Sequence, residues 1–232
     1  MTRILVVIPA RSGSKRVYRK NMRELGGVPL IDWSVNAARN IDEICDVIVS
    51  TDDVDIAKRF QDSDVMVPWL RPAELATDSA SSVDVALHAL DWYEKVHGLV
   101  DALMLLQPTS PFRTRATVLR GIDLFLQNQF RSVVAVSPAQ DHPMWALKLL
   151  NGGLIPFLDR SGLSMRSQDL PEAFMPNGSL YIVSSSDLRV SKSFFGEVST
   201  PLLIDSPLES IDIDTEWDFR LAELMLNSNN LS

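Results

Sequence analysis

Six basic side chains gather in one short stretch near the start of the chain, and they are the first residues that suggest chemistry. No acidic residue interrupts the cluster, whose members are Arg11, Lys15, Arg16, Arg19, Lys20 and Arg23. The chain as a whole is acidic, with a formal net charge of −8. A basic cluster in an acidic protein favours a local site for a small anion. Small residues nearby, including Ala10 and Ser14, let backbone N–H groups approach that anion, and a triphosphate is the natural partner.

This basic loop matches neither of the familiar glycine-rich phosphate-binding patterns. Residues 8–16 read IPARSGSKR, which is not G-x-x-x-x-G-K-[ST] and not G-x-G-x-x-G. A P-loop is therefore excluded and a dinucleotide site is disfavoured. A solvated basic loop is the alternative, but the position directly after an apolar run favours phosphate binding.

Two carboxylates near the C-terminus could hold a metal ion. Asp212 and Asp214 flank Ile213 in the segment SIDIDT at 210–215, where polar and apolar residues alternate. On a strand, residues two apart point the same way, so both carboxylates could grip one hard cation such as Mg²⁺. Magnesium usually takes one or two carboxylates with phosphate oxygens, which suits a nucleotide enzyme. The alternative is a half-buried strand whose acidic side chains face water.

Three further features carry weaker signals. Gln107, in LLQPTSP at 105–111, offers donors and acceptors suited to sugar hydroxyls or an amide, but this segment could also be only a rigid turn. Asn177 lies in what could likewise be a turn. Phe194 and Phe195 are adjacent and cannot both face inward on an extended segment, so one of them could line a pocket.

The elements that must position these residues alternate between strands and helices. Apolar runs predict strands at 4–8, 47–50, 64–67, 102–106, 132–137, 179–183 and 210–215. Periodicity and capping residues predict helices at 29–39, 54–60, 82–97, 114–127 and 215–227. This alternation predicts an α/β fold with a mainly parallel sheet and helices on both faces. Right-handed crossovers then gather the carboxyl ends of the strands on one edge, where ligands bind.

Composition and length predict one domain with an inserted lobe. The 232 residues are 46% hydrophobic and 22% charged, which is typical of a globular protein. Residues 138–176 break the alternation, so we expect an insertion of loops or β-hairpins within a single domain of residues 1–232. No apolar run is long enough for a signal peptide or a membrane helix, so we expect a soluble protein of the cytoplasm.

Several classes of function are disfavoured by simple counts. One cysteine and three histidines without ligand spacing argue against an internal disulfide, a four-ligand zinc site and covalent catalysis. The net charge argues against broad nucleic-acid binding, which needs a positive face.

Six stretches, taken together and in order, resemble the acylneuraminate cytidylyltransferases, also called CMP-sialic acid synthetases. They are IPARSGSK with KN at 20–21, STDD at 50–53, RPAELATDSASS at 71–82, LLQPTSP at 105–111, PNGSLYI at 176–182 and SIDIDT at 210–215. They span nearly the whole chain. The resemblance implies a doubly wound α/β fold and a small lobe that helps to form a homodimer. It also implies CTP as co-substrate and a divalent metal, Mg²⁺ or Mn²⁺.

The resemblance also assigns roles to particular residues. It implies that Arg11, Lys20 and Asn21 contact CTP, with Arg11 and Lys20 near the phosphates. Arg71 and Ser82 match positions near the cytidine. Asp212 and Asp214 match metal-binding carboxylates. The matched sugar-binding positions, some of which reach across the dimer in the family, are Gln107, Arg166, Asn177, Phe194 and Phe195.

The reaction implied by the resemblance is transfer of CMP to an acidic nine-carbon sugar. The C2 hydroxyl of the sugar would attack the α-phosphorus of CTP and pyrophosphate would leave, with Arg11, Lys20 and Asp214 as the catalytic residues. The chain has Met175 where relatives often have arginine, and its residues 16–19 are more basic than in many sialic acid enzymes. Legionaminic and pseudaminic acids therefore stay open as substrates. The shared basic loop also allows a related nucleotidyltransferase for an eight-carbon ulosonic acid or a sugar phosphate, although SIDIDT and PNGSLYI argue against it. A non-catalytic nucleotide-binding protein is the other alternative, and the intact set of Lys20, Asp212 and Asp214 argues against it.

Overall fold

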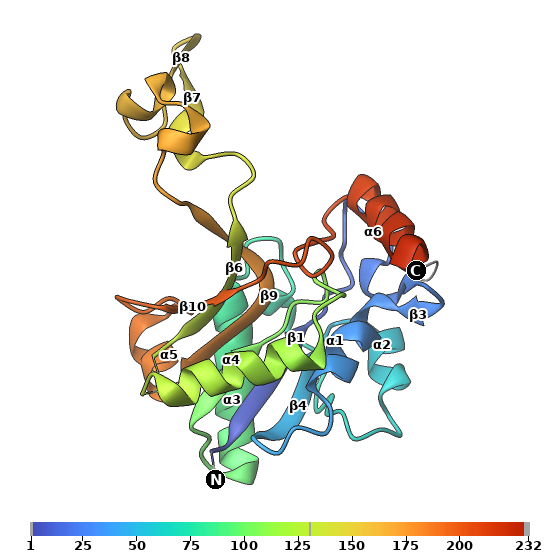
Figure 1. The fold of residues 1–232 in the computed structure, drawn as a ribbon. Helices are drawn as coiled ribbons and strands as arrows, with labels where there is room; N and C mark the ends of the chain where they lie inside the picture. Colours follow the sequence, from blue (N-terminus) through green and yellow to red (C-terminus); the bar gives the residue numbers. More distant parts are fainter. Residues whose placement is uncertain (1, 130, 230–232) are drawn as a thin grey trace.

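A six-stranded sheet forms the centre of the molecule. The computed structural model describes residues 2–129 and 131–229, and its sheet has the strand order β10-β6-β9-β5-β1-β4 (Figure 1). The strands are β1 Ile4–Pro9, β4 Ile44–Ser50, β5 Ala102–Leu105, β6 Val133–Pro138, β9 Phe174–Ser184 and β10 Thr200–Leu203. Every neighbouring pair is parallel except the two pairs of β9, which runs antiparallel to β5 and β6. The predicted α/β fold with a mainly parallel sheet is therefore confirmed.

Helices cover both faces of this sheet. They are α1 Leu30–Ala38, α2 Val54–Arg59, α3 Ser82–His97, α4 Arg115–Gln127, α5 Ser185–Ser191 and α6 Glu216–Asn229. Alternate residues of β1 explain the two layers: Ile4, Val6 and Ile8 pack with α1 and α4, whereas Leu5 and Val7 pack with α3 and α5. A strand buried on both faces is apolar at every position, as in the run ILVVI. In the part of the chain that the structure describes, no helix has the length and apolarity needed to span a bilayer.

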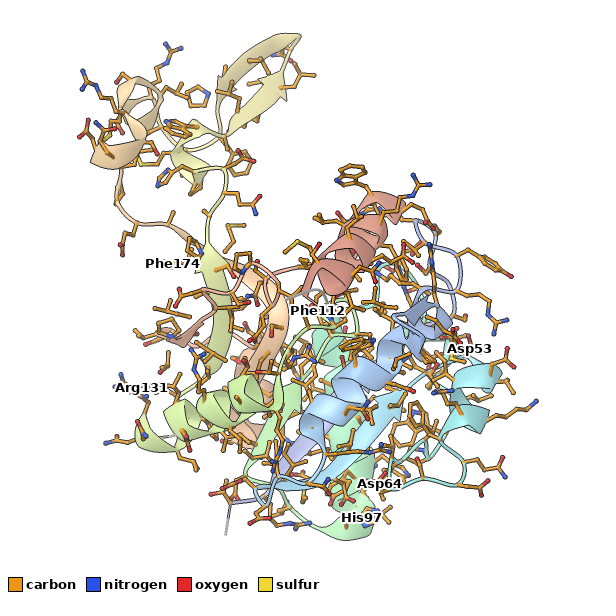
Figure 2. The ribbon with its side chains drawn as sticks, turned by 45° about the vertical axis from the view of Figure 1, so that its right-hand side comes forward. Asp53, Asp64, His97, Phe112, Arg131 and Phe174 are labelled. Carbon is orange, nitrogen blue, oxygen red and sulfur yellow. The ribbon has the colours of Figure 1, made fainter. Side chains whose placement is uncertain are left out.

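The segment between β6 and β9 projects away from the sheet as a separate arm (Figure 1). The arm carries the hairpin of β7 Leu147–Leu150 and β8 Gly153–Pro156, together with three short 3₁₀ turns. The turns are η3 Pro143–Trp145, η4 Ser161–Ser164 and η5 Ser167–Asp169. Phe174 lies where the chain returns from the arm into β9 (Figure 2). The segment between β6 and β9 thus consists of one hairpin, short 3₁₀ turns and loops.

The C-terminal part of the chain packs back onto the N-terminal loop. Ile213, with Phe219 and Ala222 of α6, forms a third apolar cluster whose other buried members are Val17, Leu25, Leu30 and Phe112. Phe112 lies beneath α6 (Figure 2). The guanidinium of Arg23 lies 3.8 Å from the ring centre of Phe219 and 2.6 Å from Glu216. These contacts bring α6 to the loop that follows β1, at the carboxyl edge of the sheet.

Two predicted strands are wrong. Residues 64–67 make only an isolated bridge, in which Met66 pairs with Ile48, because the segment leaves the sheet edge at once. Residues 210–215 form no strand, because Ile213 makes a single backbone hydrogen bond to Thr109 (2.8 Å) and has no paired ladder. The sequence analysis also missed β10 and the small hairpin of β2 Glu24–Leu25 and β3 Val28–Pro29.

Candidate functional site

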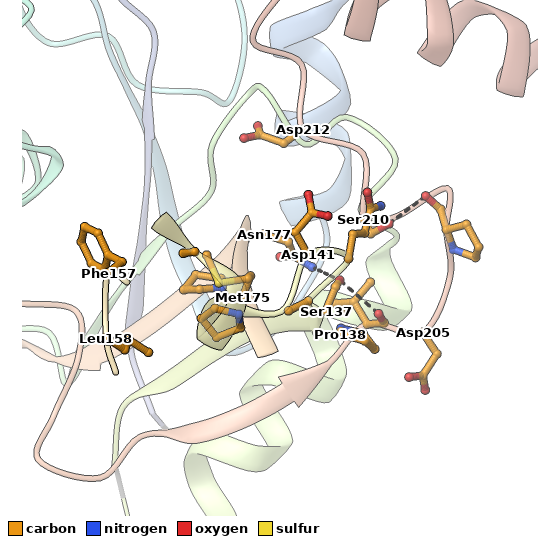
Figure 3. Close-up of a pocket in the computed structure, with 17 residues that line it drawn as sticks. Ser137, Pro138, Asp141, Phe157, Leu158, Met175, Asn177, Asp205, Ser210 and Asp212 are labelled. Carbon is orange, nitrogen blue, oxygen red and sulfur yellow. Dashed lines mark hydrogen bonds between the residues drawn. The ribbon is translucent and has the colours of Figure 1, made fainter. Parts of the chain in front are cut away.

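Three cavities lie along the carboxyl edge of the sheet. The inner cavity, of about 260 Å³, is lined by residues that include Arg11, Lys20, Asn21, Arg71, Asp78, Ser82, Gln107 and Thr109. The loop cavity, of about 460 Å³, lies against the basic loop and includes Arg11, Ser14, Lys15, Arg16, Lys20, Asn21, Asp78 and Asp214. The arm cavity, of about 800 Å³, opens at the base of the arm (Figure 3). The inner and loop cavities share four residues, so they are two parts of one hollow.

Asp78 occupies the cationic side of this hollow. Its carboxylate lies 2.7 Å from Arg11 Nη1 and also pairs with the ammonium of Lys15. The hydrogen bonds from Lys15 and Arg11 lower the pKa of Asp78, so the group stays ionised near neutral pH. A carboxylate held by two cations marks a place where a phosphate oxygen would find the same partners.

Lys20 connects the basic loop to the C-terminal segment. Its Nζ donates to the carbonyl oxygen of Ile213 (2.8 Å) and to Asp214 Oδ1 (3.2 Å), and its side chain is only 14% exposed. Arg16 approaches the other oxygen of Asp214 at 3.6 Å. Lys20 and Asn21 lie in the 3₁₀ turn η1 Lys20–Met22, which points both side chains into the hollow. The amide of Asn21 donates to the carbonyl oxygen of Arg11 (3.0 Å) and so fixes the start of the loop.

Asp52 and Arg71 hold the other side of the basic loop. Asp52 accepts from Ser12 N (2.8 Å) and from Ser12 Oγ (2.5 Å). Burial would raise the pKa of Asp52, but these hydrogen bonds and the charge of Arg71 outweigh it and lower that pKa. Arg71 is 6% exposed, and its guanidinium donates to the side chain and carbonyl of Ser50 at the end of β4. Burial lowers the pKa of Arg71 to about 10, which leaves the group charged at neutral pH.

The remaining predicted nucleotide-binding residues are not all equivalent. Ser82 is the first residue of α3, directly after the N-cap residue Ser81, and it lines the inner cavity. Ser14 lines the loop cavity. Ala10 lines neither of these cavities. Its side chain is fully buried and its N–H bonds to the carbonyl of Ser50 (2.9 Å), because the chain at this point is still running beside β4.

A buried arginine fixes the turn that carries Gln107. Arg113 donates to the carbonyl oxygens of Gln107 (2.9 Å) and Ser179, and to Ser34 Oγ (3.1 Å). Burial lowers the pKa of Arg113 to about 9, with the charge of Glu209 opposing this. Gly178 has φ +74°, and a Cβ there would collide with Gln107 Oε1. Gln107 therefore rests directly on β9, in a place that only glycine leaves open.

Asp212 lies between the inner and arm cavities. It lines the arm cavity, and the N–H of the next residue, Ile213, donates to the carbonyl oxygen of Thr109 (2.8 Å), which lines the inner one. The carboxylate of Asp212 is partly open to solvent, but the surrounding protein buries enough of it to raise its pKa. The charge of Asp214 raises this pKa further, whereas Thr109 and Lys20 lower it. The two cavities are therefore neighbours, joined by this backbone contact between the Asp212 segment and Thr109.

Asp212 and Asp214 are both on the surface even though no strand carries them. Ile213 is fully buried between them, so the alternation of the sequence survives as a burial pattern. Their mutual repulsion favours a cation beside them. Among the described residues, no group of three His, Cys, Asp or Glu side chains could hold a metal by itself, so water or phosphate oxygens would complete the shell.

Asn177 reaches the arm cavity from inside a strand. Because β9 runs antiparallel to β5, its early residues lie at the carboxyl edge, beyond the pairing of Leu105 with Tyr181. Asn177 donates to Ser137 Oγ (2.9 Å) and accepts from Ser179 N (3.1 Å). The sequence analysis placed Asn177 in a turn, whereas a strand holds it at the cavity wall.

Three predicted sugar-binding residues lie away from these three cavities within the single chain. Phe194 is 5% exposed and packs in the core beside Tyr181, at 5.6 Å between ring centres. Phe195 lines a separate hollow near Arg131, at the opposite edge of the sheet. Arg166 is exposed in the arm and lines none of the three cavities of the carboxyl edge. Of the two phenylalanines, one faces the core and one lies open, as their adjacency required.

Sequence reasoning missed Asp52, Asp78 and Arg113. The first two lie inside the quoted stretches STDD and RPAELATDSASS, but nothing in a linear pattern says which acidic residue faces the basic loop. Arg113 lies two positions after LLQPTSP, and its burial shows only in three dimensions. A charged residue close behind a turn with two prolines was the only available signal.

The fold and the hollow beside a basic loop define a nucleotidyltransferase of the α/β class. The CTP-complexed structure of CMP:2-keto-3-deoxy-manno-octonic acid synthetase has the same fold, with a TM-score of 0.68 and 16% identity, over 98% of this chain and 100% of that one. The model of the cytidylyltransferase family matches residues 5–138, up to the point where the arm begins. The chain belongs to the cytidylyltransferase family.

Relatives with assigned activities match over nearly the whole chain. The CMP-N,N′-diacetyllegionaminic acid synthase of Legionella pneumophila is 37% identical over 98% of this chain and 97% of its own length. The pseudaminic acid cytidylyltransferase of Campylobacter jejuni is 28% identical over 98% of each. The N-acylneuraminate cytidylyltransferase of Escherichia coli is 33% identical over 99% of this chain, which spans 53% of that protein. The resemblance seen in the six sequence stretches is confirmed.

Proposed function

We propose that this protein transfers CMP from CTP to the anomeric C2 hydroxyl of a nine-carbon 2-keto acid sugar of the sialic acid type. The observation that carries the proposal is the backbone hydrogen bond of Ile213 to Thr109 (2.8 Å), which brings Asp212 of the arm cavity beside the lining of the inner cavity. A nucleotide in the first cavity and a sugar in the second would meet there. The names of the relatives supply the chemical class of both substrates.

The inner and loop cavities suit a nucleoside triphosphate. Arg71 and Ser82 lie on the inner side, where we place the cytidine, whereas Arg11 and Lys20 lie where both cavities meet. Binding CTP would replace the carboxylate of Asp78 at Arg11 with phosphate oxygens, so the cationic partners are already positioned. Lys20, held by Ile213 and Asp214, would offset charge near the α-phosphate.

Asp212 and Asp214 fit a divalent cation that is shared with the nucleotide. When bound there, Mg²⁺ or Mn²⁺ would neutralise phosphate charge and orient the leaving pyrophosphate. Asp214 holds Lys20 and Arg16 toward the loop cavity through its two ion pairs. Thr109 orients Asp212.

In the transfer itself, the sugar hydroxyl oxygen forms a bond to the α-phosphorus of CTP. The bond from that phosphorus to the bridging oxygen breaks, pyrophosphate leaves with the electron pair, and the hydroxyl proton passes to solvent. Such chemistry depends on positioning and charge neutralisation rather than on a covalent protein intermediate.

The carboxylate of an acidic sugar needs a cationic partner, and the described lining of the arm cavity in one chain does not supply it. Asp141, Asp205 and Asp212 line the arm cavity, and its described lining includes no lysine or arginine. We propose a homodimer in which the arm of a second copy brings Arg166 to this cavity. The exposed leucines of the arm, such as Leu149 at 73% and Leu154 at 68%, give that contact an apolar surface. The cytoplasm, which holds CTP, is the compartment we propose.

The test is pyrophosphate release by purified protein with Mg²⁺ and CTP. The acceptors to compare are N-acetylneuraminic, N,N′-diacetyllegionaminic, pseudaminic and eight-carbon 2-keto-3-deoxy-manno-octonic acids, with ATP, GTP and UTP as alternative nucleotides. Release with a nine-carbon acid and CTP alone supports the proposal. Release only with the eight-carbon acid would reassign the acceptor, and CTP binding without any turnover would favour a non-catalytic nucleotide-binding protein.

A further inference from the structure

Arg113 is a buried cation behind the candidate site, and neither proposed substrate would touch it. It is 3% exposed and is absent from the described lining of the three cavities at the carboxyl edge. Taking a guanidinium out of water is costly, and apolar residues of similar volume often stabilise a core equally well. The stability of the fold therefore does not by itself explain why a charged side chain occupies this place.

The three nitrogens of this guanidinium bond to three separate parts of the fold. Nε donates to the carbonyl oxygen of Ser179 in β9, Nη1 donates to Ser34 Oγ in α1 (3.1 Å), and Nη2 donates to the carbonyl oxygen of Gln107 (2.9 Å). Ser34 Oγ also donates to the carbonyl oxygen of Gln107 (3.3 Å). Because the guanidinium is planar and its donors have fixed directions, these bonds set the three parts relative to one another.

A second hydrogen bond joins the turn of Gln107 to β9. Ser110, which is fully buried, donates from Oγ to the carbonyl oxygen of Asn177 (3.1 Å). This bond and that of Arg113 reach the residues on either side of Gly178, where a Cβ would collide with Gln107 Oε1. Gln107 lines the inner cavity and Asn177 lines the arm cavity. The two bonds therefore fix how one cavity lies against the other.

Glu209 extends this arrangement to the segment that carries Asp212. Its charge acts on Arg113, and its carboxylate accepts a hydrogen bond from Thr117 Oγ1 in α4 (2.5 Å). Asp212 follows Glu209 by three positions, in the segment that bonds to the turn through its backbone. The turn, β9 and the acidic segment thus all lie around one buried guanidinium.

We propose that Arg113 is a positioning residue for the transfer reaction, and this proposal rests on the function proposed above. Arg113 contacts no substrate but fixes the alignment between the acceptor hydroxyl in the arm cavity and the nucleotide in the inner cavity. A misplacement of about 1 Å between reacting groups can cost about 100-fold in rate. Arg11, Lys20 and Arg71, where we place the nucleotide, are held by other contacts, so their positions do not depend on Arg113.

The first experiment compares Arg113→Met with the native protein. Calorimetric titration with CTP and Mg²⁺ gives Kd and the number of binding sites per chain. Pyrophosphate release, with the nine-carbon acid that the native protein uses best, gives kcat per binding site, so unfolded molecules are not counted. We expect kcat per site to fall by about 100-fold while Kd for CTP changes by about threefold or less, because alignment is lost and the nucleotide contacts are kept.

The outcomes of this comparison separate the two proposals. An unchanged kcat per site in Arg113→Met would overturn the positioning role and leave the proposed function intact. A loss of CTP affinity as large as the loss of kcat would also overturn that role, since Arg113 would then support the nucleotide site as a whole. Absence of turnover in native protein that binds CTP would overturn both proposals.

A milder variant tests the same role if Arg113→Met does not fold. Ser34→Ala removes one acceptor of Arg113 and one donor to the carbonyl of Gln107, and Ser34 is absent from the described lining of the cavities. We expect kcat per site to fall by about tenfold at an unchanged Kd for CTP. Ser132→Ala is the matched control, because Ser132 is also buried and hydrogen-bonded but lies by the hollow at the opposite edge of the sheet. Equal rates in these two serine variants would overturn the positioning role.

Discussion

Lys20 and Asp214 are 194 positions apart in the sequence and lie 3.2 Å apart in the structure. The same ammonium also binds the carbonyl of Ile213, whose side chain is buried under α6 Glu216–Asn229. The apolar packing of α6 thus determines where the ion pair lies. Because Lys20 faces both the inner and the loop cavity, this contact links the fold of the C-terminus to the charge at the nucleotide site.

Lys20→Met should reduce kcat/KM for CTP by about 100-fold or more, because a preorganised cation beside the phosphates is removed. Initial rates of pyrophosphate release measure this effect, and the melting temperature shows whether the protein stays folded. Lys20→Arg, which keeps the charge, should recover part of the activity. Lys58→Met is the control, on an exposed lysine near the end of α2 Val54–Arg59. A normal rate for Lys20→Met in folded protein would remove Lys20 from the mechanism.

Asp214→Asn should abolish most turnover while the fold persists, because one of the two anionic metal ligands becomes neutral. The response of the rate to Mg²⁺ concentration should shift to higher concentrations in this variant. Glu223→Gln, on α6, tests whether losing a negative charge elsewhere in the protein has the same effect. If Asp214→Asn keeps both the rate and the Mg²⁺ response of the native protein, the metal assignment is wrong.

Asp78→Asn should lower KM for CTP, because CTP no longer has to displace a carboxylate from Arg11 and Lys15. Exposed ion pairs contribute little, so the expected decrease is about fivefold or less. The difference from the native protein should narrow as salt concentration rises. A higher KM would mean instead that Asp78 itself contacts the bound nucleotide or its metal.

Asp52→Asn should destabilise the protein most at neutral pH. The pKa of Asp52 is lowered in the folded state, so its ionised form adds stability above about pH 4, and this contribution is lost as pH falls further. We expect a loss of about 1 kcal/mol in the free energy of unfolding at pH 7, which shrinks toward pH 3. Urea unfolding across this range measures it, with Asp62→Asn as the control. A difference that does not depend on pH would show that the charge of Asp52 is not what holds Ser12.

Local patterns in the sequence determined the βα units and the basic loop. The run ILVVI predicts a strand buried on both faces, and Ser81 marks the start of α3, because burial and capping act over a few neighbouring residues. Charge clustering around Arg11 likewise needs no tertiary information. These features account for most of the sheet and for the cationic half of the site.

Only the tertiary structure decided which distant residues meet. The antiparallel direction of β9 places Asn177 at the carboxyl edge, and the packing of α6 brings Asp214 to Lys20. The segment around Asp212 alternates like a strand but has no partner to pair with, since a ladder requires a neighbouring strand as well as a pattern. Phe194 and Arg113 are buried for the same reason: burial depends on what the rest of the chain places against a residue, and sequence spacing does not contain that information.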